Sequence, residues 1–138
     1  MSTRIGRDTE ARSRSQAERQ QRGIALLADP RWNTSSAFSA QEHAERGLEG
    51  LLPPVVETLE LQAQRVLQQL DYKTSDLERY IYLIQLLEHN ETLFYRVVMA
   101  DQARFLPIIY DPTVGEACLK FGHIFRRPRG LYLAITQR

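Results

Sequence analysis

Apolar residues recur three and four positions apart from about residue 54 to residue 98, which is the spacing of one face of an α-helix. The pattern predicts three consecutive amphipathic helices: one from about Pro54 to Leu70, one ending near Glu88, and one that follows Asn90. Their apolar stripes comprise Val56, Leu59, Ala63, Val66, Leu67 and Leu70, then Leu77, Tyr80, Ile81, Ile84 and Leu87, then Leu93, Phe94, Val97 and Val98. Because each stripe needs a partner surface, the sequence predicts a mainly α fold with a helical core.

Polar residues before these stripes mark helix starts. Ser39 with Glu42, and Ser75 with Glu78, have the three-residue spacing of a capping box, in which each side chain binds a backbone amide of the other residue. Asn90 is suited to cap the third long helix.

Proline and glycine mark further boundaries. Gly47 or Gly50 is expected to end the short helix that begins after Ser39. Pro53 and Pro54 fit the first turn of the next helix, where a missing amide hydrogen costs nothing. Between residues 23 and 39 we expect an irregular segment held on a surface by Trp32 and Phe38.

Two short strands are predicted near the C-terminus. The segment 108–110 is rich in β-branched residues and lies between Pro107 and Pro112, and residues 131–136 alternate between apolar and polar. Thr113 with Glu116 is expected to cap an intervening helix that ends near Gly122. Since one short strand is a poor partner for another, the pattern suggests that a sheet domain follows.

Composition narrows the class of protein. The chain has 138 residues, a net charge of +1, 43% hydrophobic residues and 25% charged residues, as expected for a globular domain without a membrane-spanning segment. This near-neutral charge gives no reason to expect a nucleic-acid partner, so a nucleic-acid-binding helical domain is the weakest interpretation, supported only by the arginine content. The single cysteine, Cys118, excludes an intrachain disulfide and suits a reducing compartment.

The first 22 residues differ from the rest. They carry six arginines and almost no large apolar side chains, so we expect residues 1–22 to form a disordered basic tail. The arginine- and serine-rich start also allows a mitochondrial transit peptide, against which three acidic residues count. The expected location is therefore the cytoplasm, with the mitochondrion as the alternative.

Several strings, taken in order, resemble a known family. They are Gly50-Leu-Leu-Pro-Pro, Asn90-Glu-Thr-Leu-Phe-Tyr-Arg, Tyr110-Asp-Pro-Thr-Val-Gly and His123-Ile-Phe-Arg-Arg-Pro-Arg-Gly. Their order and spacing resemble the N-terminal region of the malic enzymes over about residues 23–135. On this resemblance residues 23–138 form a malic enzyme N-terminal domain, and the cofactor domain is absent from this sequence.

The resemblance implies a parent enzyme that oxidises L-malate with NAD or NADP and Mn²⁺ or Mg²⁺, and decarboxylates the product to pyruvate and CO₂. Tyr110 matches the family's general acid, which protonates the enolpyruvate carbon. A free tyrosine has a pKa of about 10 and therefore holds its proton at neutral pH.

The residues around Tyr110 are implied to support it. These are Pro112, Thr113, Val114 and Gly115, with the helix start at Thr113 setting the direction of Tyr110.

Other parts of the active site are expected elsewhere. In the family, the catalytic lysine, the metal carboxylates and the nucleotide loop belong to later sequence, and neither Lys73 nor Lys120 matches that lysine. No G-x-G-x-x-G motif occurs here. The isolated chain is therefore expected to bind no cofactor or metal and to be inactive.

The sequence departs from the family pattern at two places. Asp111 stands where the family has threonine, directly after Tyr110. Members of the family that are activated by fumarate use two arginines at a subunit interface. Arg65 matches the first of these and His89 replaces the second. Arg65 is therefore a candidate regulatory or interface residue, while fumarate activation is in doubt.

Two functions remain open at this point. The first is an N-terminal part of a malic enzyme that contributes Tyr110 and contacts within a homo-oligomer, a dimer or a tetramer, with no nucleic-acid or membrane partner. The alternative is a catalytically inactive helical interaction or oligomerisation module derived from a malic enzyme.

Overall fold

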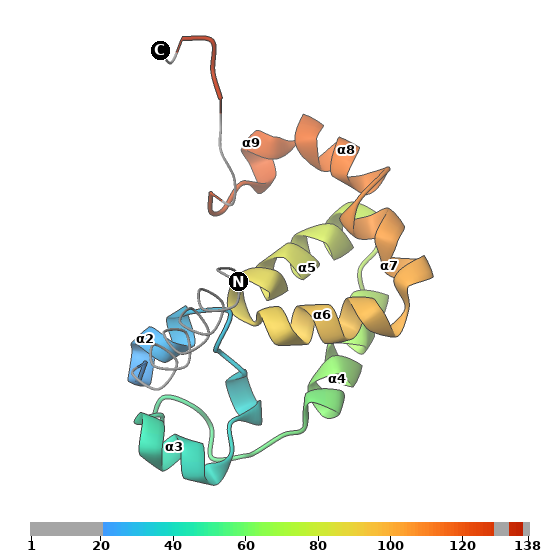
Figure 1. Ribbon diagram of the computed structural model, residues 1–138. Coiled ribbons are helices and arrows are strands. Elements are labelled where there is room, and N and C mark those ends of the chain that lie inside the picture. Colours follow the sequence, from blue (N-terminus) through green and yellow to red (C-terminus); the bar gives the residue numbers. More distant parts are fainter. Residues whose placement is uncertain (1–20, 129–132, 137–138) are drawn as a thin grey trace, which may run out of the picture.

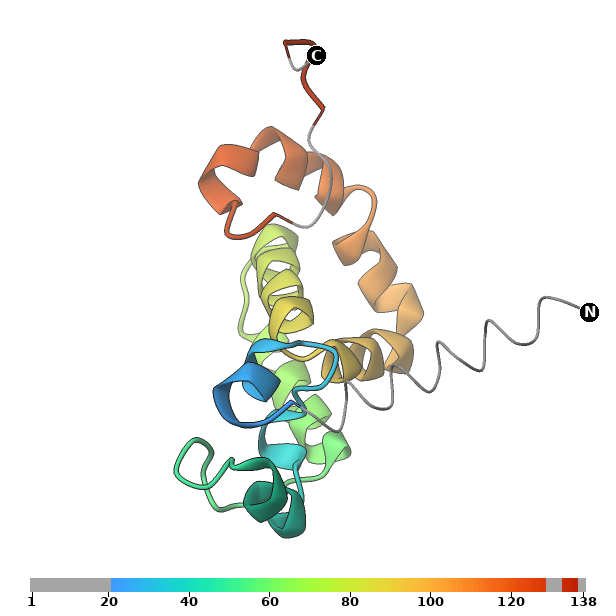
Figure 2. The same ribbon diagram turned by 60° about the vertical axis from the view of Figure 1, so that its left-hand side comes forward.

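The fold is mainly helical, as predicted. The computed structural model describes residues 21–128 and 133–136, and within these ranges there is no β-strand. Helices α2 and α3 lie at one end of the molecule and α8 and α9 at the other, with α4 to α7 between them (Figures 1 and 2). No helix in the described ranges is both long enough and apolar enough to cross a membrane.

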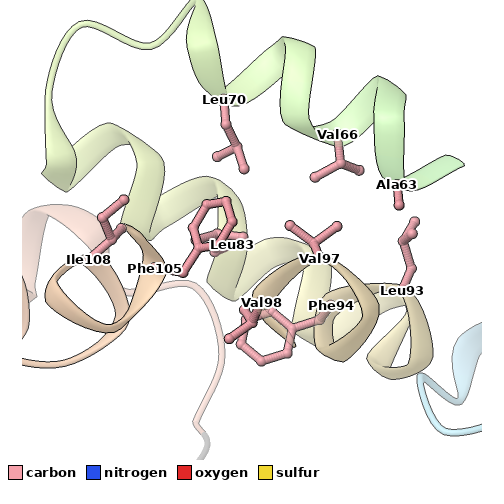
Figure 3. Close-up of a cluster of buried hydrophobic side chains, with 10 residues drawn as sticks. All are labelled: Ala63, Val66, Leu70, Leu83, Leu93, Phe94, Val97, Val98, Phe105 and Ile108. Carbon is pink, nitrogen blue, oxygen red and sulfur yellow. The ribbon is translucent and has the colours of Figure 1, made fainter. Parts of the chain in front are cut away.

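The three predicted amphipathic helices form the centre of the structure. They are α4 (Leu59–Asp71), α5 (Asp76–His89) and α6 (Glu91–Ala100), and α6 packs against both of the others. Figure 3 shows their apolar side chains converging with two from α7. This main core consists of Ala63, Val66, Leu70, Leu83, Leu93, Phe94, Val97, Val98, Phe105 and Ile108. The helical spacing therefore identified the buried faces of α4 and α6 correctly. For α5 it missed Leu83, which is fully buried, and predicted Ile81 and Ile84, which line a cavity.

Among the three long helices, the predicted starts of the second and third are confirmed and that of the first is wrong. The side chains of Ser75 and Asn90 accept hydrogen bonds from the Glu78 and Leu93 amides, as expected of N-caps. The predicted capping box of Ser75 is only half formed, because the Glu78 carboxylate accepts from the Thr74 amide and not from the Ser75 amide. The first long helix begins at Leu59, not at about Pro54, because Thr58 accepts a hydrogen bond from the Leu61 amide and caps it there.

The predicted strand at 108–110 is wrong, because Ile108 and Ile109 end α7 (Gln102–Ile109). Asp101 caps this helix, and Phe105 and Ile108, three residues apart, are both buried in the main core. Burial of this helical face outweighs the hydrogen bond that Pro107 cannot donate. The β-branched residues Ile108 and Ile109 therefore indicated a buried segment and not a strand.

Two short helices follow α7 in the part of the chain that the structure describes. They are α8 (Thr113–Leu119) and α9 (Phe121–Ile124), and α8 contacts both α5 and α7. Of the second predicted strand, residues 131 and 132 lie outside the described residues, and residues 133–136 contain a turn and no strand.

The N-terminal segment, residues 21–58, has a small core of its own. It contains α2 (Gly23–Ala28), the 3₁₀ helix η1 (Ser35–Ala37) and α3 (Ala40–Arg46), so the expectation of an entirely irregular 23–39 segment is wrong. Its buried apolar residues are Leu26, Phe38 and Leu48, with Trp32 packed against them. Trp32 and Phe38 therefore hold the segment together in a cluster of its own, whereas the prediction was that they would hold it on another surface.

The short helix α3 forms with the predicted boundaries. Ser39 and Glu42 make both hydrogen bonds of the capping box, and Gly47 ends the helix with a left-handed backbone at φ 65°. The predicted basic tail, residues 1–22, lies outside the described residues except for Gln21 and Arg22.

Candidate functional site

Tyr110 lies at the junction between α7 and α8. Its amide donates a hydrogen bond to the Leu106 carbonyl, at an N···O distance of 2.9 Å, and ends α7. Its own carbonyl accepts a hydrogen bond from the Val114 amide at 2.6 Å. The backbone of Tyr110 is thus held from both sides, while its side chain is 70% exposed.

The residues after Tyr110 build the start of α8. Pro112 is the N-cap, and its carbonyl accepts a hydrogen bond from the Gly115 amide at 3.0 Å. Thr113 makes no capping hydrogen bond, so the predicted capping by its side chain is wrong. Thr113 is instead the first residue of the helix, where it is buried at 4% exposure. Burial of Thr113 anchors the turn that presents Tyr110.

Gly115 is not explained by close packing within the described part of the chain. A Cβ added there would meet no heavy atom within 4 Å. Its use in the turn is the backbone hydrogen bond to Pro112, which any residue except proline can donate.

No lysine contact to Tyr110 is seen in the described residues. Lys120 pairs with Glu116 one helical turn away at 2.8 Å, and the ammonium group of Lys73 lies 5.6 Å from the Tyr82 ring centroid. In residues 21–128 and 133–136, no group of three or more His, Cys, Asp or Glu side chains is arranged to hold a metal ion. The described residues therefore do not form a metal site by themselves.

A cavity of about 390 Å³ lies between α5 and the α8–α9 pair and does not include Tyr110. We call it the apolar cavity. Its lining residues are Tyr80, Ile81, Ile84, Gln85, Leu87, Glu88, Ala117, Cys118, Phe121, Ile124, Phe125, Arg126 and Arg127. Leu119, next to the lining residue Cys118, is 90% exposed. This end of the molecule thus offers an apolar surface that a second folded surface can cover.

Arg65 belongs to a different cluster. Its guanidinium group forms an ion pair with Glu57, and the same carboxylate accepts a hydrogen bond from the Ser36 hydroxyl. The Ser36 hydrogen bond, followed by the Arg65 guanidinium, lowers the pKa of Glu57 below its usual value. Glu57 therefore remains an anion at neutral pH and balances the charge of Arg65.

A second cavity, of about 180 Å³, brings Arg65 and His89 together. We call it the Arg65 cavity. Its lining residues are Ser35, Ser36, Gln62, Arg65, Val66, Gln69, Tyr82, Leu86, His89, Asn90 and Leu93. Two buried polar atoms among these residues, Gln62 Oε1 and Asn90 Nδ2, have no hydrogen-bond partner. The cavity thus combines residues of the N-terminal segment with residues of α4, α5 and α6.

Sequence reasoning paired Arg65 with His89 but missed Gln62. The available signal was its position: Gln62 follows Leu59 by three residues and precedes Val66 by four, so it lies on the apolar face of α4. A polar side chain on a buried face needs hydrogen-bond partners and marks a place to inspect. Asn90 was identified only through its capping oxygen, and its amide nitrogen was overlooked.

The comparisons with known proteins agree on one family. Residues 87–138 match the family model described as malic enzyme, N-terminal domain. An NADP-dependent malic enzyme of Phaseolus vulgaris is 47% identical over 116 residues, which is 84% of this chain and 20% of the relative. An NAD-dependent malic enzyme of Vibrio parahaemolyticus is also 47% identical over 116 residues, covering 84% of this chain and 21% of the relative.

A vertebrate relative shows similar coverage. The NADP-dependent malic enzyme of Homo sapiens is 42% identical over 118 residues, which is 86% of this chain and 21% of that protein. The chain thus spans about one fifth of the length of the curated relatives that it matches. With this likeness over most of its own length, the chain belongs to the malic enzyme family, as a segment of the N-terminal part of those enzymes.

Proposed function

We propose that this chain is the N-terminal part of an enzyme that oxidatively decarboxylates L-malate to pyruvate and CO₂, and that Tyr110 is its general acid. The observation that carries the proposal is the exposed Tyr110 side chain on a backbone fixed by the Leu106 carbonyl and the Val114 amide. A general acid must reach a substrate atom from a defined position, and this arrangement meets both needs. The names of the relatives support a nicotinamide cofactor, either NAD or NADP.

In this proposal Tyr110 delivers its phenolic proton to the carbon of an enolate held by other parts of the larger enzyme. The nucleotide and the divalent cation, Mn²⁺ or Mg²⁺, supply the hydride acceptor and the stabilisation of negative charge. No described residue is assigned to either group, and no step is assigned through them. Pro112, Thr113 and Val114 act as positioning residues by fixing the α7–α8 turn.

The test is a chimaera in which residues 23–138 replace the matching region of the Phaseolus vulgaris enzyme. Tyr110→Phe is expected to lower the decarboxylation rate by about 100-fold or more, since a positioned general acid contributes that much. Tyr72→Phe is the matched control, because Tyr72 follows α4, is 84% exposed and lies in none of the strings that resemble the family. Near-normal activity of Tyr110→Phe in an active chimaera would remove the assigned role.

The isolated chain is proposed to be inactive. Tyr110 alone can donate a proton, but stabilising the enolate also needs groups that the described residues do not provide. An assay of the 138-residue chain with malate, Mn²⁺ and NAD or NADP should show no sustained turnover. Sustained pyruvate formation would contradict this proposal while leaving the family assignment intact.

Arg65 is proposed to serve regulation or subunit contact in place of catalysis. Its support is the Arg65 cavity, where it lies with His89 at the seam between the N-terminal segment and α4 to α6. Because His89 stands where a second arginine would complete a dicarboxylate site, activation by fumarate is not proposed.

A second candidate function is an inactive module that joins malic enzyme subunits. The apolar cavity and the exposed side chains around it favour this alternative, because monomeric proteins rarely leave such a surface open. Mixing the chain with a full-length relative separates the candidates. A stable mixed oligomer formed by an inactive chain supports the module, and its absence supports a catalytic segment that works only in one continuous enzyme.

A further inference from the structure

A carboxylate lies next to the proposed general acid in the chain. Asp111 follows Tyr110 directly, and both residues are exposed. Backbone hydrogen bonds fix the chain on either side of them, because the Tyr110 amide donates to the Leu106 carbonyl and the Gly115 amide donates to the Pro112 carbonyl. The turn that presents the phenol of Tyr110 therefore presents a carboxylate as well.

The charge of Asp111 is not neutralised in the part of the chain that the structure describes. Within that part its side chain forms no hydrogen bond and no ion pair. The cations of the two adjoining helices are engaged elsewhere, since Lys120 pairs with Glu116 at 2.8 Å and Arg104 pairs with Asp71. A carboxylate is ionised at neutral pH, so the α7–α8 turn carries one uncompensated negative charge.

Chain connectivity keeps this charge near the reacting end of Tyr110. Consecutive Cα atoms are about 3.8 Å apart, so the carboxylate lies within about 15 Å of the phenol oxygen whichever way the two side chains point. A proton donor has to come within about 3 Å of the atom that it protonates, so a bound substrate lies at a similar distance from Asp111. The Debye length is about 30 Å at 0.01 M salt, and at low salt the charge therefore acts on the substrate with little screening.

We infer that Asp111 is a specificity-determining residue, which disfavours binding of a substrate in proportion to the negative charge of that substrate. Malate has two ionised carboxylates at neutral pH and pyruvate has one, so the repulsion is twice as large for malate as for pyruvate. Proton transfer from the phenol to the enolate leaves their total charge unchanged. The repulsion therefore acts on substrate binding and not on the chemical step. This inference rests on the proposed function of Tyr110.

The test is Asp111→Asn, which keeps the shape of the side chain and removes its charge, in the chimaera that carries residues 23–138. At about 0.01 M ionic strength and one fixed concentration of divalent cation, the KM for malate is expected to fall about threefold. The KM for pyruvate in the reverse reaction should fall by about the square root of that factor, because the charge is halved. The kcat in each direction should stay within about twofold of the unsubstituted chimaera, as expected when uniform binding changes.

Ionic strength and a distant charge provide the controls. Both changes in KM should disappear at about 1 M salt, where the Debye length is about 3 Å. Glu49→Gln removes the same charge from an exposed residue that follows α3, at the opposite end of the molecule from α8 and α9 (Figure 1), and should leave both KM values unchanged. Equal changes for malate and pyruvate, changes that persist at high salt, or an unchanged KM for malate at low salt would each overturn the inference.

Calorimetric titration of the chimaera with malate and with pyruvate gives the same comparison without turnover. Asp111→Asn should strengthen malate binding about threefold at low salt and pyruvate binding by less. A failure of this inference is therefore distinct from a failure of the proposed function. Unaltered malate binding would remove the role of Asp111 and leave Tyr110 as the general acid, whereas near-normal turnover of Tyr110→Phe would remove the general acid itself.

Discussion

The N-terminal segment and the helices that follow it are stabilised in different ways. The main core of α4 to α7 is apolar, with Leu70, Leu83, Val97 and Phe105 fully buried. The N-terminal segment has a cluster of few apolar residues and depends on polar contacts around it. Apolar packing tolerates local adjustment, whereas a buried amide needs particular partners.

Hydrogen bonds join the two regions at a seam. The Gln62 side chain reaches Thr34 and Ser36, and the Glu91 amide donates to the Pro30 carbonyl at 2.9 Å. The Arg65 cavity lies at this seam, whereas Tyr110 lies beyond α7 in the other region. The proposed regulatory residue Arg65 and the proposed general acid Tyr110 thus lie on parts of the molecule that are held together by different kinds of contact.

The largest effect is expected from a substitution in the main core. Phe105→Ala should reduce the free energy of unfolding by about 3–5 kcal/mol, because it removes a fully buried ring and leaves a cavity. Chemical denaturation followed by circular dichroism measures this loss. Leu106→Ala is the neighbouring control, since Leu106 is 53% exposed, and it should cost much less. Similar losses for the two variants would show that α7 does not pack as described.

A smaller and more local effect is expected at the seam. Asn33→Ala removes the partners of the Leu27 carbonyl and the Ser35 amide and should destabilise the N-terminal segment by about 2 kcal/mol. Hydrogen exchange should then speed up in residues 21–58, while the amides of α5 and α6 keep their protection. Thr34→Ala, next to it and outside the buried set, is the control. Faster exchange throughout the helices would mean that the two regions unfold as one unit.

Much of the fold followed from the sequence because helical periodicity and caps act locally. The stripes of α4 and α6, the capping box of Ser39 with Glu42 and the turn at Gly47 were all predicted from neighbours in the chain. The stripe of α5 was not, because the residue that this helix buries, Leu83, is not among those predicted. The failures arose where tertiary burial decides. Ile108 is in a helix because the main core covers it, and no local pattern separated that outcome from a strand between two prolines.

The candidate sites were predicted unevenly for the same reason. Tyr110 was singled out by its motif, and the structure adds only how the turn holds it and how far the side chain is exposed. The unpaired oxygen of Gln62 could not be predicted, since the orientation of its side chain depends on contacts with residues 26 and 28 positions away in the sequence. Only the polar residue on the buried face of α4 hinted at it.

Acid is expected to produce the smallest effect and to act first on the N-terminal segment. Hydrogen bonds from Arg31 hold the pKa of Asp29 well below its usual value, and Ser36, followed by Arg65, lowers the pKa of Glu57. Groups with a lowered folded pKa bind fewer protons in the folded state than in the unfolded state. Their stabilisation is therefore complete above the unfolded pKa of about 4 and is lost as the pH falls toward the folded values.

The measurement is the fluorescence of Trp32, the single tryptophan of the chain, which packs against the N-terminal cluster. Its signal should change below about pH 4, before the circular dichroism of the helices changes. Glu57→Gln should make the Trp32 transition less steep, because one of the titrating groups is gone. Glu60→Gln is the matched control, since Glu60 is an exposed residue of α4. Loss of Trp32 fluorescence and helix content together at every pH would contradict this prediction. The polar contacts and the apolar core would then unfold as one cooperative structure, and the seam would not separate two regions of different stability.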